Sequence, residues 1–321
     1  MSQAMTQVSP RRALGASGIV VTPIGLGTNK WGVPEKNKEE VFQTFRTALD
    51  VGIDFIDTAE LYTSGKSERL IGEFTHRDTR RIVICTKFAP LPTRMSAGRV
   101  LAALDASLKR LATESIDIYL VHFPFALLST RSLMQALAKA VRMGKIRAVG
   151  VSNYGVKQMR MAATYLAQHG IPLAANEVQY SVLHRKPETN GVLAACGELN
   201  VALIAYFPLG AGLLRAAEAS DPSRQHKRRM SRLAERIITG GSGSSEQRAI
   251  LAETLQRIAL SHGGTVSQVA LNWLLQRDEH VIAIPGATSA THVRENAEAL
   301  QWSLRPEEFA AIDQASSPWK R

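Results

Sequence analysis

The sequence predicts a (β/α)8 barrel, in which eight parallel strands are surrounded by helices. Short β-branched apolar runs alternate with longer helical patterns along the 321 residues, and no clean break divides them. About eight such units joined by short loops favour a closed barrel over an open parallel sheet. No glycine-rich strand–turn–helix segment opens the chain, which argues against a doubly wound nucleotide-binding domain.

The element boundaries follow from the spacing of apolar residues and from turn signals. Ser67, just before Glu68, is expected to cap the first turn of a helix. Strands are expected at residues 24–27, 52–56, 81–87, 116–122, 146–152, 173–179, 201–207 and 281–285. Helices are expected at residues 67–75, 97–112, 129–143, 156–169, 188–199, 246–262, 267–276 and 291–300.

Three segments lie outside this repeating pattern. Residues 12–21, with Gly15 and Gly18, are expected to form a hairpin that covers the bottom of the barrel. Residues 1–10 are expected to be a disordered tail, and residues 11–321 a single domain. Residues 216–245 are rich in charge, serine and glycine and follow the seventh strand, so they are expected on the active face. They form either a lid or a surface loop, and both interpretations stay open.

The composition argues against several classes of protein. Cys85 and Cys196 form neither a C-x-x-C pair nor a zinc spacing, so reduced core thiols and no metal site are expected. The net charge of +11 is scattered, and its densest run, residues 224–236, contains no aromatic residue, so no nucleic-acid partner is expected. Neither a signal peptide nor a long apolar span is present, so we expect a cytoplasmic protein without a membrane partner.

Four ionisable residues are expected to meet at one end of the barrel. Active sites of such barrels form at the carboxyl ends of the strands. Asp57, Lys87 and His122 end three successive strands, and Tyr62 lies in the loop after Asp57. Each residue alone has an ordinary structural explanation, but their joint arrival on one face favours a catalytic site.

These four side chains make a coherent proton donor. A free tyrosine has a pKa of about 10, and a nearby ammonium lowers it by favouring phenolate. Lys87 is expected to supply that charge to Tyr62, and Asp57 to hold Lys87 through an ion pair. His122 is expected to orient a substrate carbonyl oxygen by a hydrogen bond. The site would protonate an alkoxide as it forms, which suits carbonyl reduction when a hydride donor is bound.

Several segments together resemble the aldo-keto reductase superfamily, over residues 12–302. They are GIDFIDTAELY at residues 52–62 with the Ser67-Glu68 pair, Thr86-Lys87, YLVH at 119–122, GVSN at 150–153 and NEVQYS at 176–181. The last of these is similar to bacterial and plant members. The resemblance implies a (β/α)8 barrel that transfers hydride between NADP(H), with NADH as the alternative cofactor, and a small aldehyde or ketone. It also implies the tetrad Asp57, Tyr62, Lys87 and His122, with Tyr62 as the general acid–base.

The resemblance implies where the dinucleotide binds. Ser152 and Asn153 would hold the nicotinamide carboxamide, and Tyr206 would stack under the nicotinamide ring. The remaining segments would line the pyrophosphate path and flank the adenosine end. The full set of implied cofactor residues is Thr28, Asp57, Ser152, Asn153, Glu177, Tyr206, Pro208, Leu209, Gly210, Gly212, Pro285, Gly286, Ala287, Thr288, His292, Glu295 and Asn296.

The sequence departs from the family pattern at four positions. Thr63 stands where glycine is frequent, Phe207 where serine is, and His292 where arginine or glutamine is. Glu177 stands where a glutamine is expected to grip the carboxamide; an ionised Glu177 would favour the cationic, oxidised nicotinamide. Gln179, on the same face two residues later, is the alternative carboxamide ligand.

Two other functions and the walls of the substrate pocket follow from the same residues. A non-catalytic regulatory protein could be built on this barrel, although the complete tetrad disfavours it. A lyase with a Schiff base on Lys87 would need a neutral lysine, which an adjacent carboxylate disfavours. The pocket walls are expected to include Trp31, Tyr62, Phe88, Phe123 and loop residues after Ala216; Trp31 and Phe88 could equally be packing residues.

Overall fold

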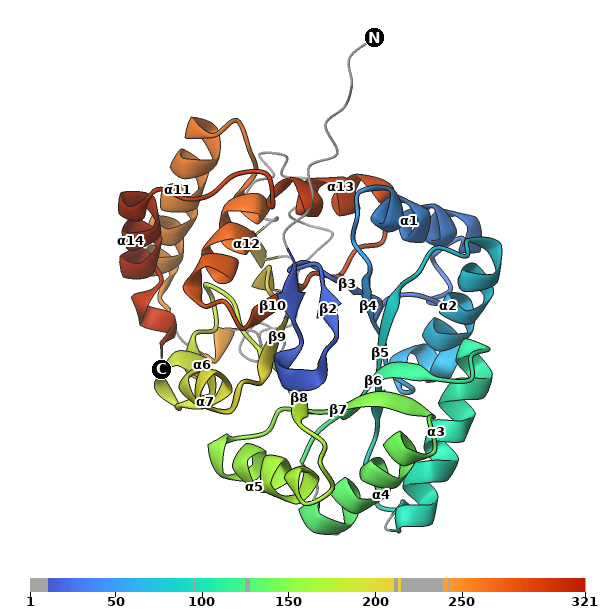
Figure 1. Cartoon of the computed structure of the whole chain (residues 1–321). Helices are drawn as coiled ribbons and strands as arrows, with labels where there is room; N and C mark the ends of the chain where they lie inside the picture. The colour runs from blue at the N-terminus through green and yellow to red at the C-terminus, as the bar shows by residue number, and fades with distance from the viewer. Residues whose placement is uncertain are drawn as a thin grey trace.

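Eight parallel strands form a nearly closed barrel in the computed structural model, as the sequence predicts (Figure 1). The structure describes residues 11–94, 96–124, 128–210, 213–214, 239–241 and 243–320. Neighbouring strands follow one another around the sheet in chain order, and parallel bridges from Ile24 to Ala283 and from Gly27 to Gly286 join its two ends. The strands are β3 (Leu26–Gly27), β4 (Phe55–Asp57), β5 (Val83–Phe88), β6 (Ile116–Val121), β7 (Ile146–Ser152), β8 (Leu173–Gln179), β9 (Ala202–Tyr206) and β10 (Val281–Ile284).

Helices surround the barrel and bury the outer faces of its strands (Figure 1). Because side chains alternate along a strand, Ile118 and Leu120 point into the barrel, while Tyr119 and Val121 pack against helices. The helices are α1 (Lys38–Asp50), α2 (Lys66–Arg77), α3 (Ala97–Leu111), α4 (Thr130–Arg142), α5 (Val156–Ala167), α6 (Lys186–Thr189), α7 (Val192–Leu199), α11 (Ser245–Ser261), α12 (Val266–Arg277), α13 (Ala290–Glu298) and α14 (Pro306–Ala315).

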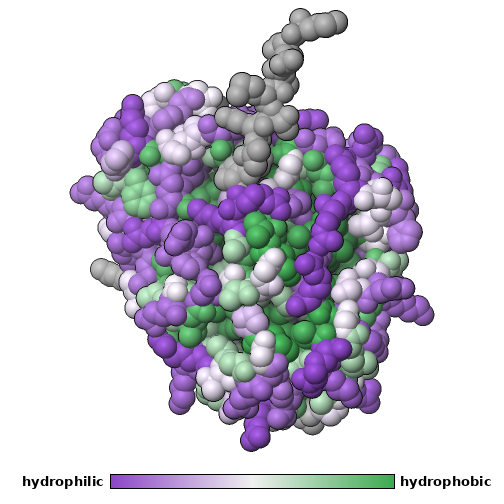
Figure 2. Space-filling view, viewed as in Figure 1, coloured by the Kyte–Doolittle hydropathy of each residue, from purple (hydrophilic) through white to green (hydrophobic). Residues whose placement is uncertain are grey.

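A hairpin of β1 (Arg12–Ala13) and β2 (Val20–Val21) lies across one end of the barrel, as predicted (Figure 1). Its apolar residues Leu14, Ile19 and Val21 are at most 4% exposed and pack onto the inner core of the barrel. Figure 2 shows this face, with hydrophobic residues near its centre and hydrophilic residues around them. The hairpin therefore closes the bottom of the barrel to water.

Among the described residues, two helices were not predicted from the sequence. They are α1, at residues 38–50, and α14, at residues 306–315. The signals were present, because the Asn37 side chain accepts a hydrogen bond from the backbone N–H of Glu39, and Pro306 begins α14. In both helices acidic residues also fill the first turn, where the helix dipole favours them.

The single helix predicted at residues 188–199 is wrong. The structure has two short helices, α6 and α7, separated at Asn190 and Gly191. Gly191 has φ of 80°, a left-handed conformation that interrupts a right-handed helix. The predicted tail at residues 1–10, and most of the loop at residues 216–245, lie outside the described residues. Among the described residues, no helix is both long and apolar enough to span a bilayer.

The contact between α2 and α3 generates a test of the packing. A Cβ atom at Gly72 of α2 would lie 2.7 Å from the carbonyl oxygens of Arg110 and Leu111, at the end of α3. Gly72→Ala should therefore lower the free energy of unfolding by about 1–3 kcal/mol, since backbone must move to relieve the contact. Gly98→Ala in α3 is the control, because the nearest atom there is 3.9 Å away; this variant should be neutral or stabilising by less than about 1 kcal/mol. Urea unfolding of both variants measures the difference. Wild-type stability of Gly72→Ala would contradict the close contact between Gly72 and the end of α3.

Candidate active site

The four residues expected to form a catalytic site come together at the carboxyl ends of the strands. Asp57 ends β4, Lys87 lies near the end of β5, and His122 follows β6. Tyr62 begins a short 3-10 segment after β4. The Lys87 Nζ donates to Asp57 Oδ1 at 2.5 Å and to the Tyr62 hydroxyl at 3.4 Å. The Tyr62 and His122 rings are 6.1 Å apart, edge to face.

Lys87 is fully buried and contacts two carboxyl groups. Its Nζ lies 3.2 Å from Glu177 Oε2, in addition to the contact with Asp57, and it also donates to the Thr58 carbonyl oxygen at 2.9 Å. Burial alone would lower the pKa of Lys87, but the charges of Asp57 and Glu177 raise it well above its ordinary value. Lys87 therefore stays charged, which excludes the neutral lysine that a Schiff-base lyase requires.

Lys87 lowers the pKa of Tyr62, as expected, but the net pKa of Tyr62 does not fall below its ordinary value. Burial raises the pKa of Tyr62 above its ordinary value, and the attraction of Lys87 does not offset it. Asp57 and Glu177 raise this pKa further. The attraction of Lys87 is the second-largest influence on this pKa, but it is smaller than the effect of burial. Tyr62 therefore holds its proton, as a proton donor must.

His122 is neutral near neutral pH. Burial, and to a lesser degree the charge of Lys87, lowers the pKa of His122 to about 4. One ring nitrogen then carries a hydrogen and can donate it to a substrate oxygen. The backbone N–H of His122 donates to the Phe88 carbonyl at 2.9 Å, which fixes the residue at the end of its strand. Within the described part of the chain, the buried Nδ1 has no hydrogen-bond partner.

The segment after Tyr62 explains one departure from the family pattern. Thr63 and Ser64 have φ of 47° and 57°, in the left-handed region that favours glycine. Thr63 adopts this conformation while its hydroxyl donates to the Trp31 carbonyl oxygen at 2.6 Å. That bond compensates for the conformational cost of a side chain at this position and holds the loop that carries Tyr62.

Two of the expected pocket walls are packing residues. Trp31 is fully buried against Phe74 and donates from its indole nitrogen to the Ala287 carbonyl oxygen at 3.0 Å. Phe88 is also fully buried. Phe123 is half-buried with its ring 5.7 Å from that of His122. The expected wall residues after Ala216 lie largely outside the described residues.

Ser67 and Glu68 connect α2 to the strands below the site. The expectation that Ser67 caps a helix is wrong. The helix begins one residue earlier, at residue 66, and the Ser67 hydroxyl bonds the hydroxyls of Thr28 at 2.8 Å and Thr58 at 2.9 Å. Glu68 is fully buried and accepts from the Thr86 hydroxyl at 2.6 Å. Both residues therefore join α2 to the strands that carry Asp57 and Lys87.

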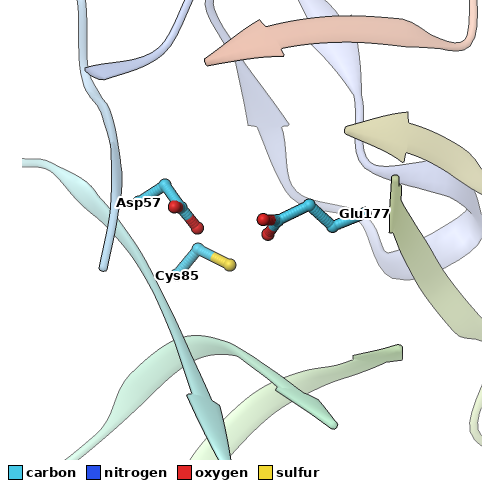
Figure 3. Close-up of side chains that lie close together, drawn as sticks. All are labelled: Asp57, Cys85 and Glu177. Atoms are coloured by element: carbon cyan, nitrogen blue, oxygen red, sulfur yellow. The ribbon is translucent and has the colours of Figure 1, made fainter. Parts of the chain in front are cut away.

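Asp57, Cys85 and Glu177 point toward one another inside the barrel, from β4, β5 and β8 (Figure 3). One ligand atom from each lies within 4.8 Å of the others, but Lys87 already supplies the positive charge that a metal would bring. Burial, and next the charge of Asp57, raises the pKa of Glu177 to about 8. Glu177 is therefore mainly protonated at neutral pH, which corrects the expectation that it is ionised.

Most of the expected cofactor residues line one cavity of about 380 Å³ above this cluster. Glu177 lines the cavity and Gln179 does not, which favours Glu177 as the residue facing a ligand. Gly210, Glu295 and Asn296 are not part of the lining, and Gly212 lies outside the described residues. The expected residues that line the cavity are Thr28, Asp57, Tyr62, His122, Ser152, Asn153, Glu177, Tyr206, Pro208, Leu209, Pro285, Gly286, Ala287, Thr288 and His292.

Hydrogen bonds orient the residues at the ends of β7 and β9. Asn153 has φ of 61°, and its side-chain nitrogen donates to the His122 carbonyl at 3.2 Å and to the Ser152 hydroxyl at 3.1 Å. Its side-chain oxygen accepts from the Tyr206 hydroxyl at 3.0 Å. The Phe207 ring packs edge to face on Tyr206, with centroids 5.2 Å apart. The Tyr206 ring is thus held beside the cavity that it lines.

Comparison with known proteins agrees with this geometry. The model of the aldo/keto reductase family matches residues 23–317.

The chain belongs to the aldo/keto reductase family.

Three relatives illustrate the similarity of this aldo/keto reductase to known proteins. The chloroplastic pyridoxal reductase of Arabidopsis thaliana is 34% identical, over 92% of this chain and 83% of its own length. A thermostable aldo-keto reductase solved with the inhibitor epalrestat is 32% identical, with a TM-score of 0.77 over 95% of this chain and 99% of its own. An aldo/keto reductase from Klebsiella pneumoniae, solved with NADP and acetate, is 30% identical. Its TM-score is 0.76, over 97% of this chain and 96% of its own.

Four further residues of this aldo/keto reductase line the cavity without having been predicted from the sequence. They stand at or just after the carboxyl ends of the first and last strands, and the rule that located the other site residues could have found them. They are Gly27, Asn29, Lys30 and Ile284; Phe207, one of the departures from the family pattern, follows β9 and lines the cavity as well. Lys30 is exposed, so the cavity carries a basic residue besides His292.

The protonated state of Glu177 predicts a pH-dependent contribution to stability. Its pKa in the folded protein, about 8, lies above that of an unfolded glutamate, so the folded state binds more protons. This contribution is fully present below about pH 4.5 and is lost as the pH rises to about 8, by at most about 1.4 kcal/mol per pH unit. The unfolding free energy of Glu177→Gln should therefore rise relative to wild type over this window.

Urea unfolding at a series of pH values measures this difference. The exposed Glu114 provides the control. The difference in unfolding free energy between Glu114→Gln and wild type should stay constant over this pH range. If the difference in unfolding free energy between Glu177→Gln and wild type were also constant with pH, Glu177 would be ionised in the folded protein.

Proposed function

We propose that this chain transfers hydride between NADP(H) and a small aldehyde or ketone, with Tyr62 as the general acid–base. The observation that carries the proposal is the position of the Tyr62 hydroxyl. It lines the cavity beside His122 and lies 3.4 Å from the buried ammonium of Lys87. No other arrangement in the described part of the chain joins a protonated phenol, a neutral imidazole and an ammonium at the strand ends of the barrel.

The residues around the cavity fit a nicotinamide dinucleotide. Glu177 Oε2 is buried without a hydrogen-bond partner in the described structure, and a carboxamide NH2 would supply a donor. Beside it, Ser152 and Asn153 offer polar groups and Tyr206 an aromatic face. Gly27 and Gly286 also line the cavity, and a Cβ on Gly27 would lie 3.0 Å from the Ile284 carbonyl oxygen, so glycine lets the first and last strands approach closely there.

The other residues would hold the remainder of the dinucleotide. Thr28, with Pro208 to Gly210 and Gly212, would border the pyrophosphate. The adenosine end would lie along the loop after β10 and the start of α13, beside His292. The residues assigned to that end are Pro285, Gly286, Ala287, Thr288, His292, Glu295 and Asn296. NADP as cofactor agrees with the complex solved for the Klebsiella relative.

The protein residues then handle the proton while the bound nicotinamide supplies the hydride. His122 donates a hydrogen bond to the carbonyl oxygen and so polarises the bond to carbon. As negative charge develops on that oxygen, the Tyr62 hydroxyl transfers its proton to it. The raised pKa of Tyr62 does not prevent this step, because an alkoxide is a stronger base than a phenolate. Lys87 stabilises the phenolate that remains, at 3.4 Å.

The non-catalytic alternative has less support. A binding protein on the same barrel would not need a charged lysine buried between two carboxyl groups and next to a tyrosine. Such a cluster is costly to bury, so it is more simply explained by catalysis. A panel of small aldehydes and ketones, followed by nicotinamide absorbance, tests turnover directly. Failure of every reactive aldehyde with both NADPH and NADH would favour the non-catalytic alternative.

Tyr62→Phe tests the assignment of the acid. The variant keeps the ring and removes the transferable proton, so turnover should fall by about 10²–10⁴-fold. Cofactor affinity should stay near the wild-type value, because the hydroxyl acts on the substrate oxygen. Tyr165→Phe on the outer helix α5 is the matched control and should keep full activity. Wild-type rates in Tyr62→Phe would rule out Tyr62 as the acid.

Cofactor preference should depend on pH through His292. NADPH should be preferred over NADH, and a histidine beside the 2′-phosphate contributes full charge only when protonated. The preference should therefore be modest, several-fold, and should weaken from pH 7 to pH 9, where the phosphate itself is already ionised. His292→Ala should reduce the preference at pH 7 and flatten the pH dependence, whereas Lys30→Ala measures any contribution of the second basic residue. A strong preference for NADH at every pH would contradict this assignment.

A further inference from the structure

We propose that Glu177 releases a proton when the oxidised cofactor binds, so that the affinity for NADP+ relative to NADPH rises with pH. The inference rests on the proposed function, because it requires the nicotinamide to bind in the cavity beside Glu177. It concerns the Asp57–Lys87–Glu177 cluster, which combines two carboxyl groups with a single ammonium.

The enclosure of the cluster makes a second negative charge unfavourable. Lys87 is fully buried, and the side chains of Asp57 and Glu177 are at most 3% exposed. With both carboxyls ionised, the cluster would carry a net charge of −1 away from water. A proton on one of them leaves the cluster neutral, which a low-dielectric site strongly favours.

Geometry assigns that proton to Glu177. Lys87 lies 2.5 Å from Asp57 in a hydrogen bond, whereas it lies 3.2 Å from Glu177 Oε2, an atom without a hydrogen-bond partner in the described structure. Burial raises the pKa of Asp57 as well, but the charge and the 2.5 Å hydrogen bond of Lys87 oppose that rise, so Asp57 keeps the charge and Glu177 the proton. Glu177 is therefore the carboxyl that changes its charge, and it is also one that lines the cavity.

The titratable groups around Glu177 keep their charge between pH 6 and pH 9. Burial raises the pKa values of Tyr62 and Cys85, and it raises that of Tyr206 to about 12. Burial lowers the pKa of His122 to about 4, so this ring is neutral throughout the range. The pKa of about 8 at Glu177 thus identifies it as the group of the cluster that titrates.

Only the oxidised nicotinamide carries a positive charge on its ring. That charge stabilises a carboxylate beside it, so NADP+ binding lowers the pKa of Glu177, whereas NADPH binding does not. Linkage then requires the converse, that ionisation of Glu177 strengthens NADP+ binding. If the pKa falls by about one unit, NADP+ binding releases about half a proton near pH 7.5, and the NADP+/NADPH affinity ratio rises by up to about tenfold from pH 6 to pH 9.

Two measurements on the wild-type protein test the inference without any variant. Fluorescence titrations with NADP+ and NADPH at pH 6 to 9 give the affinity ratio. Calorimetry in two buffers of different ionisation enthalpy counts the protons released. The ratio isolates Glu177, because both cofactors carry the same 2′-phosphate and meet the same His292. The expected result is proton release with NADP+ and little with NADPH.

Glu177→Gln identifies the group responsible. Glutamine keeps the size and a carbonyl acceptor but cannot ionise, so the affinity ratio should become independent of pH and the extra proton release should vanish. A pH-independent ratio in the wild-type protein, or proton release that persists in Glu177→Gln, would overturn the inference alone. Absence of binding by both cofactors would overturn the proposed function and the inference with it.

Discussion

The pairing of one buried ammonium with two carboxyl groups is the interaction on which the site depends. Lys87 has no contact with solvent, so its charge is tolerable only because Asp57 and Glu177 surround it. These three residues come from β4, β5 and β8, so the cluster links strands on different sides of the barrel. The cluster also reaches the cavity, because Lys87 contacts the Tyr62 hydroxyl and both Asp57 and Glu177 line the cavity.

The apolar interior below the cluster controls its charges. The inward positions just below the cluster carry apolar side chains. Examples are Phe55 and Ala175, which lie two residues before Asp57 and Glu177 on the same strands. The hairpin then closes the far end of the barrel with residues such as Leu14. Water is excluded from beneath the cluster, and this desolvation is the largest cause of the raised pKa values of Tyr62 and Glu177.

The departures from the family pattern differ in whether they change the charges of the site. Thr63 occupies a left-handed conformation suited to glycine, and one hydrogen bond to a backbone carbonyl offsets the cost. That change leaves the charges of the site untouched. Glu177 replaces a neutral amide by a group that can ionise, in contact with Lys87. A substitution of nearly equal size therefore couples the redox state of the cofactor to pH in the proposed scheme.

The barrel and the residues that meet at the carboxyl ends of its strands could be predicted from the sequence. Both follow from local patterns, since apolar periodicity marks each strand and the carboxyl end of a strand locates Asp57, Lys87 and His122. The protonation states could not be predicted in this way, because at Tyr62 and Glu177 the effect of burial outweighs the attraction of Lys87. Those states depend on how deeply groups from distant strands are buried together, and spacing along the chain carries no measure of that burial.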